Sequence, residues 1–263
     1  MAEAAPLPAY LQLVRADNPG PMTLEGTNTW VVGDPAEALP VVVDPGPALE
    51  EHLHAVVEAA GGRAGAVVLT HRHADHAESA AELAGRLDCP VLAVDPSLRL
   101  GGGELGEATT VRAGTTALTA YLTPGHTGDS CSLLVQGEDG VRRLITGDTV
   151  LGRGSTVIAT PDGDLGAYLD SLARLQTLVQ EDGVVEILPG HGPRVGNPRE
   201  WLAEYRRHRQ ERLQQVRDAL AAGDQTAREV VERVYAAVDR SVWPAAEQSV
   251  QAQLRYLSTS TAG

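Results

Sequence analysis

The first three-quarters of the chain alternates short apolar runs with longer amphipathic segments. Runs rich in Val and Leu predict strands at residues 29–33, 41–44, 66–70, 91–94, 132–136 and 142–146, with a return to strand and loop within 184–190. Apolar residues spaced three and four apart predict helices at 47–60, 76–87 and 164–181. Strands interleaved with helices, several of them neighbours along the chain, predict a layered α/β sandwich.

The pattern changes after residue 196, where no further strand is predicted. Helical spacing covers residues 199–222, 225–238 and 244–257, with Asp224 or Thr226 near the cap of the second helix. We therefore predict two domains, an α/β domain at 1–196 and a small helical domain at 197–263. An apolar face on the helical domain would allow a homodimer.

The charge of the chain is negative and uneven. The net charge is −14; residues 1–195 carry 11 Arg and 26 acidic residues, whereas residues 196–263 carry 10 Arg and 9 acidic residues. Lys is absent, so every strongly basic side chain is Arg. The first segment is therefore too acidic to bind nucleic acid through bulk charge.

The two cysteines, Cys89 and Cys131, do not form a C-x-x-C pair, which favours free buried thiols in a reducing compartment. The segment MAEAAPLPAYLQLV lacks the basic and apolar regions of a signal peptide. No apolar run approaches the length that crosses a bilayer. We expect a cytoplasmic protein without a membrane partner.

Candidate metal ligands are most concentrated in LTHRHADHAES, residues 69–79, directly after an apolar run. His71 and His73 are two apart, so in extended backbone their side chains point the same way and can hold one ion. Asp75 and His76 follow as a helix begins, and the turn directs them elsewhere. The spacing H-x-H-x-D-H therefore suits a second ion beside the first.

Three more candidate ligands follow apolar runs and are flanked by Gly: His126 in TPGHTGDS, Asp148 in LITGDTV and His191 in ILPGHGP. Gly allows the backbone to turn sharply and to approach a site closely. Together with the first motif they supply five His and two Asp. Imidazole suits Zn²⁺ and a carboxylate can bridge two ions, so we predict two zinc ions per chain.

These motifs resemble the metallo-β-lactamase superfamily, with THRHADH, His126, Asp148 and His191 matching its metal ligands in order. The resemblance implies an αββα sandwich. It also implies one metal held by His71, His73 and His126, a second held by Asp75, His76 and His191, and a bridging Asp148.

A closer resemblance is to the β-lactamase-like protein 2 family, carried by NPGPMTLEGTNTWVVG at 18–33, TGDTVLGRGSTV at 146–157 and the helical C-terminal region. It implies a winged-helix-like C-terminal domain. Because the chain ends soon after Tyr256, we expect a short or missing wing. Members of that family include a single-strand-specific endoribonuclease.

The predicted site suits hydrolysis. Zinc lowers the pKa of a bound water from about 15.7 to about 7, so a metal-bridging hydroxide would be the nucleophile. Asp75 would either take its proton, as a catalytic residue, or serve only as a ligand. No G-x-S-x-G motif suggests a serine nucleophile instead.

Three functions are open. The first is a single-stranded RNA endoribonuclease, with Arg207 and Arg209 of the Arg-rich segment 198–217 on phosphates. However, interleaved glutamates, such as Glu211 four residues from Arg207, favour a solvated helix with ion pairs. The second is a thioesterase or glyoxalase II-like acyl hydrolase of esters and thioesters. The third is a winged-helix binding module with a structural metal, although structural zinc sites are usually closed. We expect loops 18–28 and 152–160 to select the substrate.

Overall fold

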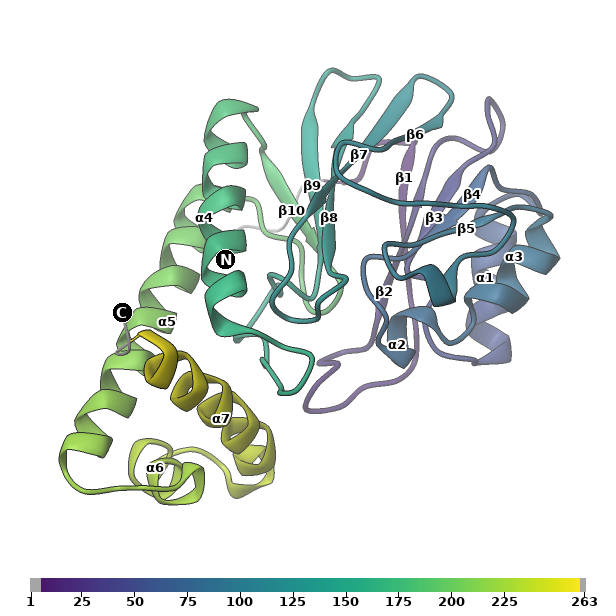
Figure 1. Cartoon of the computed structure of the whole chain (residues 1–263). Coiled ribbons are helices and arrows are strands. Elements are labelled where there is room, and N and C mark those ends of the chain that lie inside the picture. The colour runs from purple at the N-terminus through teal and green to yellow at the C-terminus, as the bar shows by residue number, and fades with distance from the viewer. Residues whose placement is uncertain (1–5, 261–263) are drawn as a thin grey trace.

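Two five-stranded sheets packed face to face, with helices on both outer sides, form the body of the protein (Figure 1). This computed structural model describes residues 6–260. In the first sheet the order is β1 (Leu11–Arg15), β2 (Asn28–Val32), β3 (Val41–Val43), β4 (Ala66–Val68) and β5 (Val91–Leu92). In the second it is β10 (Glu186–Pro189), β9 (Arg142–Gly147), β8 (Cys131–Gln136), β7 (Thr116–Leu122) and β6 (Thr110–Ala113). The predicted αββα sandwich is confirmed.

Strands β2, β3 and β4 of the first sheet are buried on both faces, which explains their apolar runs. Val41 and Val43 of β3 lie in the core between the two sheets, whereas Val42 faces the outer helices. Those helices are α1 (Glu50–Ala59) and α3 (Ala80–Leu87), which bury Leu53 and Leu83 against the sheet. Between β4 and α3 lies the one-turn helix α2 (Ala74–Ala77).

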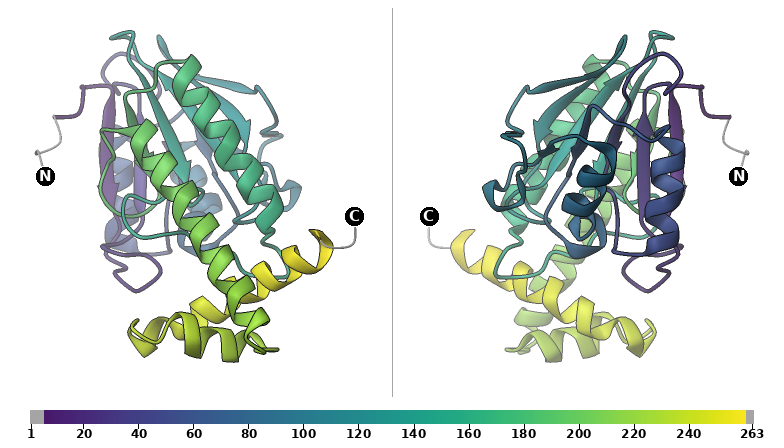
Figure 2. Two further views of the ribbon diagram at one scale, coloured as in Figure 1. Left: turned by 90° about the vertical axis from the view of Figure 1, so that its left-hand side faces the viewer. Right: turned by 90° about the vertical axis from the view of Figure 1, so that its right-hand side faces the viewer.

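The second sheet is covered by α4 (Leu165–Glu181) and α5 (Pro198–Ala221), which cross its outer face in Figure 2. The predicted apolar stripe of α4 is buried, with Tyr168 and Leu172 fully enclosed. Leu202 of α5 joins the same buried cluster. The first part of α5 thus packs on the sandwich, although the domain boundary near residue 196 stays a prediction.

The helical region is completed by α6 (Ala227–Val234) and α7 (Trp243–Ser260), with the short 3₁₀ helix η2 (Arg240–Val242) between them. Thr226 caps α6 in a capping box with Glu229, as one of the two predicted caps. No strand occurs between residues 197 and 260, so the described region has no wing strand. Figures 1 and 2 place α6 and α7 at the same end of the sandwich as α2.

Several element predictions were wrong in detail. The strands β1 and β6 were not predicted, and the strand expected before His126, which is β7, was given no bounds. β6 and β7 read TVRA and TALTAYL, whose Thr and Ala residues give little apolar contrast. The helix predicted at 76–87 is divided into α2 and α3, because the backbone amide of Ser79 donates to the carbonyl of Gly46 instead of to a carbonyl of the preceding turn. The helix predicted at 225–238 ends at Val234.

Two further predictions concern the cysteines and membrane-spanning helices. Cys89 and Cys131 are both free; Cys131 is buried as predicted, whereas Cys89 is only partly buried. Within the described residues, no helix is both long enough and apolar enough to span a bilayer.

Candidate metal centre

The predicted site residues meet at one edge of the sandwich because their strands run in the same direction. β7 and β9 are both antiparallel to β8, and β10 is parallel to β9, so all three end at the same edge. His126 follows β7, Asp148 follows β9 directly, and His191 follows β10. The H-x-H-x-D-H segment follows β4 of the opposite sheet. The seven predicted residues are therefore brought together across both sheets.

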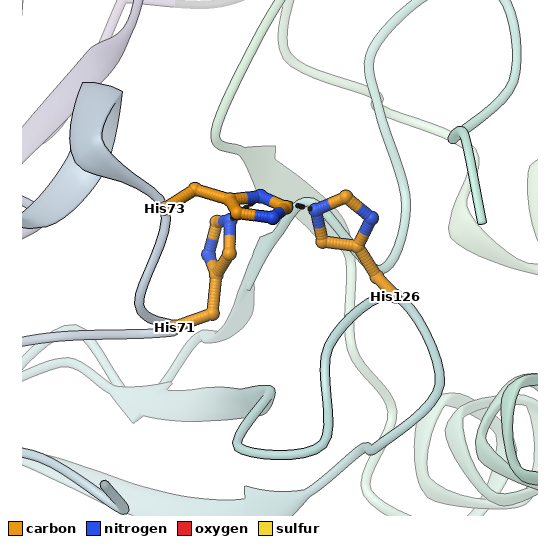
Figure 3. A group of neighbouring side chains, drawn as sticks. All are labelled: His71, His73 and His126. Carbon is orange, nitrogen blue, oxygen red and sulfur yellow. Dashed lines mark hydrogen bonds between the residues drawn. The ribbon is translucent and has the colours of Figure 1, made fainter. Parts of the chain in front are cut away.

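His71, His73 and His126 form the first group of donors, and Figure 3 shows their rings pointing toward one another. Nδ1 of His73 lies 3.1 Å from Nε2 of His71 and 3.0 Å from Nε2 of His126. His71 and His126 are buried, whereas His73 is exposed. The group therefore opens to solvent on the His73 side.

Asp75, His76 and His191 form the second group. Nε2 of His76 lies 3.1 Å from Nε2 of His191, and Oδ2 of Asp75 lies 3.1 Å from the same His191 atom. Both histidines are buried, but the side chain of Asp75 is 30% exposed. Asp75 is thus the part of this group that a substrate could reach.

Asp148 lies between the two groups. Its Oδ2 is 3.7 Å from Nε2 of His126 and 3.4 Å from Nε2 of His191, and its Oδ1 is 3.5 Å from Nε2 of His76. Oδ1 is buried and has no hydrogen-bond partner within the described chain. This placement is the one expected of a carboxylate that bridges two cations.

Backbone carbonyls orient two of the histidines from outside. Nδ1 of His126 donates to the carbonyl of Val157 at 2.8 Å, and Nδ1 of His191 donates to the carbonyl of Gly26 at 3.2 Å. A carbonyl can only accept, so each Nδ1 carries a proton. In the neutral rings the lone pair therefore lies on Nε2, which faces the centre of the site.

A buried carboxylate, Asp44, orients the other two buried histidines. Its Oδ2 accepts from Nδ1 of His76 at 3.0 Å and from the hydroxyl of Thr70 at 2.7 Å. Because the Thr70 hydroxyl proton is directed to Asp44, its oxygen accepts from Nδ1 of His71 at 3.0 Å. His71 and His76 consequently also present Nε2 lone pairs to the centre.

This donor arrangement fits metal cations. The Nε2 atoms of His76 and His191 are 3.1 Å apart, and in the neutral rings both carry lone pairs that repel each other unless a cation or proton lies between them. Asp148 adds an unpartnered buried carboxylate oxygen to the same space. Imidazole nitrogens combined with carboxylates are typical ligands of Zn²⁺.

The pKa values divide the histidines into two classes in the absence of metal. Burial lowers the pKa of His71 well below its usual value, and burial also lowers the pKa of His126. Burial opposes the charged forms of His76 and His191 too, but nearby carboxylates, above all Asp148, outweigh it. They raise the pKa of His76 and bring the pKa of His191 to about 10. His71 and His126 are therefore poised neutral, whereas His191 holds a proton that a cation must displace.

Asp44 is a functional residue that the sequence analysis missed. It lies within ligand distance of His71 and His76, but it faces their Nδ1 side, so it orients these rings rather than sharing a cation with their Nε2 atoms. The available signal was its position in VVVDPG, directly after a buried strand, as Asp148 directly follows β9.

Two polar residues of the loops expected to select the substrate make structural contacts instead. Asn28 donates its amide to the carbonyls of Pro189 and Gly192, and Thr156 donates its hydroxyl to the carbonyl of Asp148. Both side chains are buried. They hold the ligand-bearing loops in place rather than facing a substrate.

Comparison with known proteins agrees with this geometry. Residues 22–191 match the metallo-beta-lactamase superfamily, and residues 226–260 match the beta-lactamase associated winged helix domain. The chain belongs to the metallo-β-lactamase superfamily and is a hydrolase of that superfamily. The C-terminal helices are therefore a winged-helix-like domain, as predicted.

Individual relatives cover most of the chain. A Beta-lactamase-like protein 2 homolog of Caenorhabditis elegans is 32% identical over 252 residues, which cover 91% of this chain and 81% of the relative. An Atrochrysone carboxyl ACP thioesterase of Aspergillus fumigatus is 35% identical over 218 residues, which cover 79% of this chain and 64% of that protein. A crystal structure of a beta-lactamase domain protein from Burkholderia ambifaria has a TM-score of 0.79 at 23% identity and covers 98% of this chain and 88% of that one.

Proposed function

We propose that this protein is a binuclear zinc hydrolase of acyl thioesters. The observation that carries the metal assignment is the placement of Asp148 between two donor groups, His71, His73 and His126 on one side and Asp75, His76 and His191 on the other. When bound there, zinc would polarise the substrate carbonyl and lower the pKa of an attacking water.

The protein itself would hold the metal-binding donor atoms in position. Its buried histidines are held by fixed outer hydrogen bonds, so their donor atoms need little reorganisation. The opening of the site lies on the side of His73 and Asp75, the two more exposed members. An open side of this kind suits an enzyme better than a closed structural site.

Asp75 has two roles that experiment can separate. Its carboxylate is 30% exposed, against 11% for Asp148, so it is the acid nearer to an incoming substrate. If it takes the proton of the attacking water, Asp75→Asn keeps bound metal but loses turnover. If it serves only as a ligand, Asp75→Asn loses metal and turnover together.

The arginines weigh against RNA as the substrate. Arg207, expected to meet a phosphate, pairs with Glu204 and Glu211 on the exposed face of α5, so the predicted ion pair is observed. Arg209, the other arginine expected on phosphate, is buried and donates to the carbonyl of Thr156. Arg207 is neutralised by its carboxylate partners and Arg209 is buried, so the exposed face of α5 presents neither charge to a polynucleotide backbone. Relatives named as acyl carrier thioesterases support the thioester alternative.

Parallel assays test this proposal. Zinc-loaded protein is given an acyl thioester, with the released thiol measured, and a single-stranded RNA oligonucleotide. We expect thioester hydrolysis that disappears in His71→Ala and on chelation. His54→Ala is the matched control, because His54 is an exposed histidine of α1.

The contrary outcomes are distinct. RNA cleavage without thioester hydrolysis, lost in His71→Ala, would assign the endoribonuclease function instead. A metal-loaded protein that cleaves neither substrate, nor simple esters, would favour a winged-helix binding module with a structural metal.

A further inference from the structure

A cavity of about 570 Å³ lies where the sandwich meets the C-terminal helices. We call it the junction pocket; its lining residues fall within 21–22, 155–157, 208–212, 235–242 and 244–249. The first two segments belong to the loops 18–28 and 152–160, which the sequence analysis expected to select the substrate. The remaining segments come from α5, α7 and the connection between α6 and α7.

The charge of the junction pocket is opposite to that of the chain. Arg209, Arg212 and His208 line it, and no Asp or Glu does, in a protein whose net charge is −14. A lining of this composition favours an anionic ligand group.

Neither arginine is neutralised by the protein. Arg209 is only 6% exposed, lies 4.9 Å over the ring of Tyr168, and has a buried Nε without a hydrogen-bond partner. Arg212 lies 4.3 Å over the ring of Tyr235 and donates to Gln215. Among residues 6–260, no carboxylate lies within ion-pair distance of either guanidinium, in contrast to Arg207 on the same helix.

The rest of the lining is largely apolar. Met22 and Val238 are among the most exposed large apolar side chains of the described chain, and both line this pocket. Val157, Val242 and Ala246 extend the same apolar lining. An apolar chain that carries one anionic group would match both parts of the pocket.

The junction pocket shares a wall with the candidate metal centre. The carbonyl of Val157 holds His126, and the hydroxyl of Thr156 donates to the carbonyl of Asp148. Arg209 donates to the carbonyl of Thr156 from the pocket side. A ligand in the pocket therefore lies against the same segment that positions two of the proposed metal ligands.

We infer that the junction pocket binds an apolar chain ending in a phosphate or carboxylate, with Arg209 and Arg212 receiving the anion. That this ligand is part of a substrate rests on the proposed thioesterase function. Two sources share this chemistry: a thiol carrier that bears phosphate, and an acyl chain that ends in a carboxylate.

The kinetic test compares three thioesters of similar acyl length: one on a phosphate-bearing thiol such as coenzyme A, one with a terminal carboxylate on a neutral thiol, and one without an anion. Arg212→Gln should raise KM for one anionic substrate by about 10- to 100-fold, as expected for lost charge-assisted hydrogen bonds, with kcat within about twofold. The anionic substrate that is affected identifies the source. The neutral thioester should be unaffected.

Two further variants keep the test decisive. Arg207→Gln, on the exposed face of α5, is the matched control and should leave KM unchanged for all three substrates. Arg209→Lys retains the charge but loses the planar donor, and should also raise KM for the affected substrate. Equal KM values for wild type and Arg212→Gln with both anionic substrates would overturn the inference.

Direct binding separates this inference from the proposed function. Coenzyme A and a medium-chain dicarboxylate are titrated calorimetrically into the wild type and Arg212→Gln, without turnover. If the protein hydrolyses no thioester, binding of either anion that is lost in Arg212→Gln still supports the pocket. Failure of both anions to bind the wild type would refute it, whatever the protein hydrolyses.

Discussion

Oδ2 of Asp44 lies 3.0 Å from Nδ1 of His76, and neither side chain is accessible to solvent. The same oxygen accepts the Thr70 hydroxyl, whose oxygen accepts in turn from His71. One buried carboxylate thus orients one histidine from each proposed metal group. Metal ligands without such outer partners typically bind about 10- to 100-fold more weakly.

Asp44→Asn should therefore weaken both metal sites, by about 10- to 100-fold each. Oδ1 accepts from the backbone amide of Thr70, while Oδ2 accepts from Thr70 and His76. An amide nitrogen in either place would face a donor. Metal affinity, measured by competition with a chromophoric chelator, checks the prediction.

The choice of Asn in this experiment avoids a backbone effect. Asp44 has φ of 53°, and Asn tolerates this left-handed conformation better than Ala does. Asp170→Asn, an exposed change on α4, serves as the control. Wild-type affinity at both sites in Asp44→Asn would show that Asp44 does not orient the ligands.

The two metal sites should respond differently to acid. The pKa of His191 is raised to about 10, so in the metal-free protein this ring holds a proton at neutral pH, and the pKa of His76 is also raised. The pKa values of His71 and His126 are lowered, so these rings are already neutral there. Each proton that a cation must displace weakens binding about tenfold per unit fall in pH.

Dialysis from pH 8 to pH 6 should therefore empty the Asp75, His76 and His191 site before the other. Metal content measured at each pH, in wild type and in His126→Ala, identifies which site has lost its ion. Calorimetry in buffers of different ionisation enthalpy should also show proton release on metal binding. Simultaneous loss of both ions, without proton release, would contradict this order.

Gly190 leaves space between its backbone and two side chains of the candidate metal centre, Asp148 and His76. A Cβ at this position would lie 2.7 Å from Oδ1 of Asp148 and 2.8 Å from Cε1 of His76, both closer than real Cβ contacts. Gly190→Ala should separate these two side chains. Displacements of about 1 Å can reduce turnover by about 100-fold.

Gly196→Ala is the matched control, because a Cβ there meets nothing within 4 Å. We expect Gly190→Ala to lose turnover and metal affinity while Gly196→Ala keeps both. Circular dichroism should show both variants folded. If Gly190→Ala retained wild-type metal affinity, the close packing around Asp148 would not matter for the site.

The sequence analysis named the residues that meet in the candidate site, but it missed a residue that orients them. His71, His73, Asp75 and His76 share one short motif, so their chemistry is visible without any tertiary information. Asp44 was missed because its role depends on a contact with Thr70, 26 residues away, which no local pattern reveals. Residues that orient the proposed ligands can be recognised only from contacts in the folded structure, whereas the ligand motif can be recognised from its residue types and spacing.

Arg209 illustrates a second limit. Helical spacing placed it on an Arg-rich, solvated face, and this was correct for Arg207, which forms the predicted ion pairs. Arg209, two residues on, is buried over Tyr168 of α4. Periodicity predicts the faces of a helix, but which face is covered depends on how α5 packs against the sandwich.

Arg72, between the proposed ligands His71 and His73, connects the candidate metal centre to three loops. Its guanidinium lies 3.1 Å from Asp129, 3.5 Å from Asp95 and 3.7 Å from Asp162. The side chain of Asp129 is only 5% exposed, so it would be left without a cation if Arg72 were removed.

Arg72→Met should therefore loosen the loop that carries Asp129 and His126, and should weaken the first metal site more than the second. Arg72→Lys should restore part of the affinity, because it keeps the charge but not the planar geometry. Since Arg72 is 43% exposed, high salt should diminish the difference between wild type and Arg72→Met. Site-resolved metal affinity and hydrogen exchange across residues 124–130 provide the measurement. Equal weakening of both sites would show that Arg72 acts on overall stability rather than on the position of His126.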